Sequence, residues 1–161
     1  MTERVSDQAL NVADLAASFL GTTHFRRRYR PVRSAESRTG WRIRDVANNG
    51  DDSCAAFVSY VLVANNLLGR SRSTVQTMVN AMEDHGWQET GEPVLGGVAV
   101  WGCREDIVLD GSNLGHSGIY VGEGRFVSHS SIVFTPVEHP LQLSDGRVPA
   151  AYYTHDKLTT G

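Results

Sequence analysis

The residue best placed for covalent chemistry is Cys54, which lies between an acidic turn, Asp51-Asp52-Ser53, and a largely apolar run from Ala55 to Leu62. This pattern predicts a buried helix that carries the thiol in its first turn. Unpaired N–H groups and the helix dipole favour a thiolate there, whereas the nearby carboxylates oppose it. A cysteine in such a window is often only a small buried hydrophobe. We therefore expect Cys54 to need a histidine partner if it acts as a nucleophile.

Two histidines flank a predicted β-hairpin later in the chain. His116 begins an apolar segment, Gly115-His116-Ser117-Gly118-Ile119-Tyr120-Val121-Gly122, and His129 ends the next one. The turn Gly122-Glu123-Gly124 predicts that both lie near the same end of the hairpin. His116 is then the candidate general base, and His129 is the candidate for a third group that orients it. Most of the other histidines are expected at the surface: His24, His85, His139 and His155.

The elements that must position these residues follow from periodicity and turn signals. Apolar spacing predicts helices over 7–20, capped by Asp7, over 53–66 and over 73–85. Short apolar runs predict strands at 95–101, 116–121, 125–130, 132–137 and 150–154. Residues 22–50 are expected to form a long loop. Helices first and an antiparallel sheet of about five strands second predict an α+β fold, with 53–66 as the central buried helix.

Size and composition favour a single ordinary domain over residues 1–161. We expect no membrane span, because no apolar run approaches 18 residues. The N-terminus lacks a basic region followed by an apolar core, so we expect a cytoplasmic protein, export by a non-Sec route, or a phage-associated protein. Two cysteines are too few for a disulfide framework, and no cluster has metal-ligand spacing. We therefore expect neither a metal nor a cofactor.

The net charge of −3 hides a strong asymmetry. Residues 26–44 contain eight arginines and one glutamate, so this segment carries +7 and the rest of the chain −10. Two interpretations stay open: a solvated loop with scattered ion pairs, or a docking surface for an anionic substrate or partner. Nucleic acid is the weaker choice of partner, because no binding motif accompanies the basic segment.

Four segments together resemble NlpC-like cysteine peptidases, a papain-fold group that cleaves amide bonds in bacterial cell-wall peptides. They are Leu20-Gly21-Thr22-Thr23-His24, Ser53-Cys54-Ala55-Ala56-Phe57-Val58, Gly96-Gly97-Val98-Ala99-Val100-Trp101, and the 115–122 segment with Phe126-Val127-Ser128-His129. The resemblance spans roughly residues 10–135. It implies that Cys54 is the nucleophile, His116 the general base and acid, and His129 the orienting residue. It also implies that the backbone N–H of Cys54 helps to stabilise the oxyanion.

The resemblance has departures at the nucleophile motif and at the turn after the first helix. Ser53 replaces an aspartate, Ala55 and Ala56 replace Ser-Gly, and His24 stands in place of a tyrosine. The expected substrate contacts are His24, Asp52, Ser53, Ser117, Arg26 and Arg28. The expected function is amide hydrolysis in peptidoglycan stem peptides, with the arginine-rich segment bordering the cleft.

Two alternatives stay open. In the first, the same fold acts as an intracellular or delivered amidase, deamidase or acyltransferase, such as an effector toxin with an immunity protein or a phage enzyme. In the second, the chain is a non-catalytic binding module that uses its basic segment.

Overall fold

The computed structural model describes residues 5–27, 29–45, 53–102 and 114–159. In these ranges the helices are α1 (Asp7–Ser18), α2 (Cys54–Ala64), α3 (Val75–Asp84) and α4 (Asp156–Thr159). The strands are β1 (Tyr29–Arg33), β2 (Trp41–Asp45), β3 (Trp87–Thr90), β4 (Val98–Gly102), β5 (Leu114–Gly122), β6 (Arg125–His129), β7 (Pro136–Pro140) and β8 (Pro149–His155). None of these helices has the length and apolar character of a membrane span.

The predicted helices are present with small changes at their ends. The N-cap of α1 is Ser6 rather than Asp7, because the Ser6 hydroxyl accepts a hydrogen bond from the Ala9 N–H at 3.0 Å. Asp7 instead lies in the first helical turn, where its charge complements the helix dipole. The prediction for α3 ran slightly long, since Thr74 caps it by accepting from the Thr77 N–H at 3.2 Å.

The main sheet has six antiparallel strands in the order β3-β8-β4-β5-β6-β7. The predicted hairpin of β5 and β6 lies between β4 and β7 in this sheet, and its turn contains Glu123 at φ +53° and Gly124 at φ +72°. Strand β3 was not predicted. The strand expected at 132–137 lies later, because residues 131–133 form a turn and pairing with β6 begins at Pro136.

The two faces of the sheet are buried differently, and this difference places the candidate site. One face packs against α1, α2 and α3 to form the main core, to which the sheet contributes Val98, Val100, Ile119 and Val127. The other face carries a smaller apolar cluster of Ala99, Trp101 and Phe126, joined by Tyr120, Leu143 and Tyr152. Seven of the 11 residues of helix α2 are buried, whereas Tyr60 is exposed, and the helix contacts both β5 and β6.

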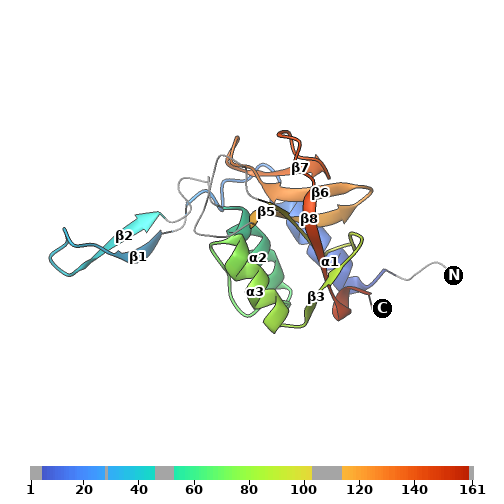
Figure 1. The fold of residues 1–161 in the computed structure, drawn as a ribbon, viewed down its shortest axis with the longest axis horizontal. Coiled ribbons are helices and arrows are strands. Elements are labelled where there is room, and N and C mark those ends of the chain that lie inside the picture. Colours follow the sequence, from blue (N-terminus) through green and yellow to red (C-terminus); the bar gives the residue numbers. More distant parts are fainter. Residues whose placement is uncertain (1–4, 28, 46–52, 103–113, 160–161) are drawn as a thin grey trace.

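The expected loop over 22–50 is wrong in its central part, because β1 and β2 form a hairpin there. Their register pairs Tyr29 with Asp45 and Arg33 with Trp41. The hairpin projects away from the rest of the molecule (Figure 1), and no side chain that the structure describes within it is buried. The sequence obscured these strands, since exposed arginines replace the apolar alternation of a half-buried strand. Arg28, Asp51 and Asp52, whose expected effects are described above, fall outside the described residues, as does the second cysteine, Cys103.

Candidate active site

Cys54 is the first residue of α2, and its half-buried side chain lies at the start of β5. Its Sγ is 4.0 Å from the carbonyl oxygen of Gly115, the residue directly before His116. A thiol at this position is close to the unpaired N–H groups of the first helical turn. The Cys54 side chain therefore contacts the backbone of β5, the strand that carries His116.

Ser53, expected to contact substrate, has a different position. The residue is fully buried, and its Oγ donates a hydrogen bond to the carbonyl oxygen of Phe25 at 2.6 Å. It makes no side-chain cap at the start of α2. Ser53 thus ties the segment that follows α1 to the helix that carries Cys54, and it offers no surface to a substrate.

His116 lies on the face of the sheet that is turned away from the helices. It is paired with Trp101 across β4 and β5, and the two ring centroids are 5.2 Å apart. The ring of His139 lies 6.0 Å away on the same face. His116 lines a cleft of about 550 Å³ together with serines and apolar residues of β7 and the segment that follows it.

The surroundings of His116 keep its imidazole neutral. Burial lowers the pKa of His116 to about 3, and neighbouring His139 and Arg147 lower it as well, whereas Asp145 raises it. A thiolate–imidazolium ion pair in the resting protein, which the sequence led us to expect, is therefore opposed by this environment. Neutral imidazole can still accept a proton while the sulfur attacks a substrate.

His129 lies on the opposite face of the sheet from the His116 ring. The register pairs Ile119 with Val127 in the main core. His129 is two residues after Val127 and shares its face, while His116 is three residues before Ile119 and has the other face. His129 is buried and belongs to a strand that contacts α2. The hairpin was predicted correctly. Its alternation puts the two side chains on opposite faces, although His129 is still near enough to contribute to the lowered pKa of His116.

The polar group that the structure does bring to His116 comes from β7. His139, expected at the surface, is half-buried on the His116 face, with Ser128 beside it. Its Nδ1 is 2.7 Å from the carbonyl oxygen of Pro140, and its Nε2 is 2.6 Å from the Ser128 Oγ. A carbonyl only accepts, so Nδ1 carries the proton and Nε2 accepts from the serine hydroxyl. Only the register of β7 against β6 reveals this pair.

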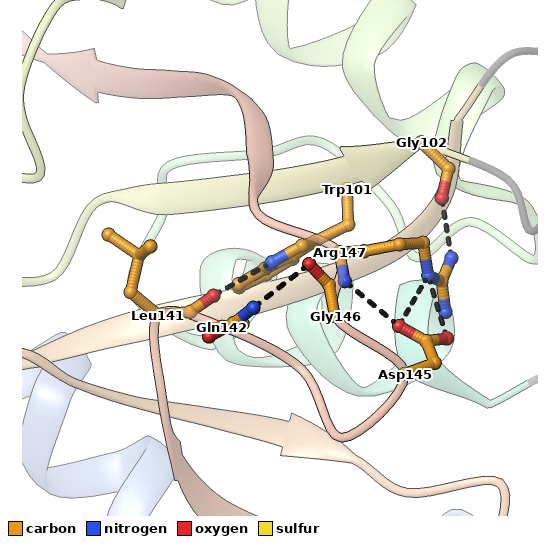
Figure 2. Close-up of polar contacts among 7 residues, drawn as sticks. All are labelled: Trp101, Gly102, Leu141, Gln142, Asp145, Gly146 and Arg147. Atoms are coloured by element: carbon orange, nitrogen blue, oxygen red, sulfur yellow. Dashed lines mark hydrogen bonds and ion pairs between the residues drawn. The ribbon is translucent and has the colours of Figure 1, made fainter.

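A strap formed by residues 141–147 closes one side of the cleft (Figure 2). The indole N–H of Trp101 donates to the carbonyl oxygen of Leu141 at 3.0 Å. Arg147 donates to the carbonyl oxygen of Gly102 and forms an ion pair with Asp145 at 2.9 Å. The strap therefore fixes both a positive and a negative charge close to His116.

A smaller cavity of about 170 Å³ lies on the α2 side and includes His24. The exposed His24 ring packs in an aromatic cluster with Phe25 at 4.9 Å and Tyr60 at 5.9 Å between centroids. Arg26 lies over the Phe134 ring, 5.5 Å from its centroid. Among the other expected substrate contacts, Ser117 is fully buried, while Asp52 and Arg28 are outside the described residues.

Within the described ranges, no group of three or more histidine, cysteine, aspartate or glutamate side chains is arranged to hold a metal ion.

The mixed α/β architecture, with α2 packed on an antiparallel sheet, is that of an NlpC-like fold. The structure of NlpC2 from Trichomonas vaginalis matches 96% of this chain with a TM-score of 0.54 and 13% sequence identity, over 50% of its own length. NlpC1 from the same organism matches 96% of this chain with a TM-score of 0.54 and 14% identity, over 47% of its length. The chain thus spans about half the length of these proteins. Neither a family model nor a curated protein matches its sequence.

Proposed function

We propose that the protein is a thiol hydrolase that cleaves amide bonds in peptidoglycan stem peptides, with Cys54 as its nucleophile. The observation that supports this proposal most is the position of the Cys54 thiol. It stands at the start of a buried helix, 4.0 Å from the backbone of the strand that carries His116, in an NlpC-like fold. A buried cysteine with a purely structural role requires neither the helix start nor the histidine strand.

The reaction proceeds in two steps. For the first step the His116 ring must turn at the start of β5 from the Trp101 face towards Cys54, which lies on the helix side. Cys54 then transfers its proton to the neutral imidazole as the sulfur attacks the carbonyl carbon, and the backbone N–H of Cys54 helps to stabilise the oxyanion. The C–N bond then breaks, the amine leaves with the proton held by His116, and a thioester remains on Cys54. In the second step His116 takes a proton from water, the hydroxide attacks the thioester, and the acid and the free thiol are released.

The cleft beside His116 has walls that suit a peptide. Ile132, Val137 and Leu143 provide apolar surface, while Ser130 and Gln142 offer hydrogen-bonding groups for a peptide backbone. Trp101 and His139 contact the His116 ring in its resting position on the face away from the helices. His129 does not hold that position, because it occupies the other face of the sheet.

The test is digestion of purified muropeptides with a mass-spectrometric readout of the bond that is cut. Wild-type protein and a Cys103→Ala control are expected to release stem-peptide fragments, and Cys54→Ala is expected to release none. Turnover by Cys54→Ala refutes the nucleophile. Wild-type protein that leaves muropeptides intact but cleaves other amide or acyl substrates, with loss of activity in Cys54→Ala, refutes the cell-wall substrate and retains the thiol chemistry.

A further inference from the structure

The β1–β2 hairpin has two exposed faces of different chemistry. On one face Arg33 is paired with Trp41, and Ile43 follows two residues later. The guanidinium of Arg33 lies 4.6 Å from the Trp41 ring centroid, while 45% of Trp41 and 68% of Ile43 remain exposed. The other face carries Arg42, and Arg44 follows two positions along the same strand. Aromatic and arginine side chains of this kind are the residues that most often anchor protein interfaces.

Nothing in the described part of the molecule covers this hairpin. It projects from the body (Figure 1), and β1 and β2 pair only with each other. An isolated two-stranded ribbon is marginally stable in water, so contact with a further surface would stabilise it. Unpaired strand edges and exposed apolar side chains together favour a partner that adds to the ribbon.

The chain also carries a surface of opposite charge, on the other side of the body from the hairpin. Strand β3 is a terminal strand of the main sheet. Residues 83–92, which include β3, contain four acidic residues and no lysine or arginine. All four carboxylates are exposed, and both Glu83 and Glu89 act on Tyr153 of the neighbouring β8. In Figure 1, α2 and α3 lie between the hairpin and β3, which separates the two surfaces within one molecule.

We propose that the β1–β2 hairpin docks on the acidic β3 edge of a second copy of this chain. The hairpin over residues 29–45 holds five arginines and two acidic residues and carries +3, whereas residues 83–92 carry −4, so the two surfaces are complementary between two copies. Pairing of two hairpins is excluded as the main contact, because it brings arginines against arginines. Nucleic acid is disfavoured, since the acidic remainder of the chain repels a phosphate backbone. The contact joins different surfaces of the two copies and is therefore heterologous. It does not depend on the thiol chemistry.

Sedimentation velocity over a concentration series, at low and at high salt, measures this association directly. The wild-type protein is expected to self-associate at low salt and to dissociate as salt screens the exposed charges. Two double variants, Arg42→Glu with Arg44→Glu and Glu83→Arg with Glu89→Arg, are each expected to weaken association about tenfold or more. Arg70→Glu and Asp14→Arg, which change exposed charges elsewhere, are the matched controls and are expected to associate like the wild type.

Mixing the two double variants gives the sharpest result. The hairpin made acidic in one variant can then meet the β3 edge made basic in the other. We expect the mixture to regain association that neither variant shows alone. Trp41 reports the contact, since Trp87 and Trp101 are buried. Its emission should become less accessible to acrylamide as protein concentration rises.

A protein that stays monomeric at low salt overturns the proposal. So does association that is unaffected by both double variants, or a mixture that fails to regain it. A monomer whose Trp41 emission changes on addition of duplex DNA also overturns it, in favour of nucleic acid. Circular dichroism confirms that every variant is folded.

Discussion

At the scale of single residues, the proposed chemistry requires the Cys54 thiol at a helix start and the His116 ring, which burial keeps uncharged. His116 packs between Trp101 and His139 on one face of the sheet, whereas Cys54 approaches the start of β5 from the helix side. In the proposed reaction the proton moves only while the sulfur attacks. The same burial has consequences for stability and for activity.

The low pKa of His116 predicts a loss of stability in acid. Its pKa is about 3 in the folded protein and 6.5 in the unfolded chain, so between these values the unfolded chain binds more protons. The free energy of unfolding should therefore decrease as pH falls from about 6.5 towards 3, by up to about 1.4 kcal/mol per pH unit from this group. Urea unfolding at pH 7 and pH 4.5 measures the difference, which should shrink in His116→Gln. His24→Gln, with an exposed ring, should keep the wild-type difference; equal behaviour of both variants contradicts the account.

Because His116 and His129 lie on opposite faces of the sheet, we expect their substitution to lower the activity by different amounts. In His116→Gln, kcat for amide hydrolysis should fall about 100-fold or more, because the proton acceptor is removed. In His129→Gln the loss should be clearly smaller. Steady-state kinetics on folded variants checks this. An equal or greater loss in His129→Gln would instead place His129, on the helix side of the sheet, in the reacting pair.

At the scale of elements, the start of α2 is fixed by tertiary contacts rather than by a side-chain cap. The Ser53 hydroxyl donates to the Phe25 carbonyl, and the helix is held by burial of seven of its 11 residues. The sequence predicted α2 because its apolar content is continuous, and it predicted β5 and β6 because glycines mark their turn. It did not predict β1 and β2, because arginines in these strands replace the apolar residues of an alternating pattern. It also did not predict that His139 lies near His116, because this contact depends on the pairing of β7 with β6.

The buried bond between Ser53 and Phe25 predicts a measurable cost for its removal. Ser53→Ala leaves the Phe25 carbonyl without its buried donor, and the free energy of unfolding should fall by about 1–3 kcal/mol. Ser18→Ala removes an exposed hydroxyl that bonds within α1 and should change stability by less than about 0.5 kcal/mol. Urea unfolding compares the two. If Ser53→Ala is as stable as Ser18→Ala, the anchor is not a significant constraint on α2.

At the scale of the whole molecule, the body and the hairpin are energetically distinct. Both apolar clusters are built from residues outside 29–45. The NlpC-like fold therefore belongs to the helices and the six-stranded sheet, with the hairpin as an appendage. A single domain over residues 1–161 stays a prediction.

Removal of the hairpin is predicted to leave the body folded. Tyr29 and Asp45 are paired partners, so their Cα atoms are about 5 Å apart and a Gly-Gly link can replace residues 30–44. The melting temperature should stay within about 4 °C of the wild-type value, because little buried contact is lost. Replacing residues 141–147 by a glycine-serine segment of equal length should lower it more, since this removes the packing of Leu143 and the Arg147 side chain that binds Asp145 and the Gly102 carbonyl. Collapse of the fold on removal of the hairpin contradicts this division.

The most direct test of the central claim is the rate of Cys54 alkylation by iodoacetamide as a function of pH, in a Cys103→Ser background. Because neutral His116 accepts the Cys54 proton during attack, alkylation near neutral pH should be clearly faster than in a His116→Gln variant, and labelling should abolish amide hydrolysis in parallel. Equal rates in the two proteins, or full activity after complete labelling of Cys54, would contradict the account.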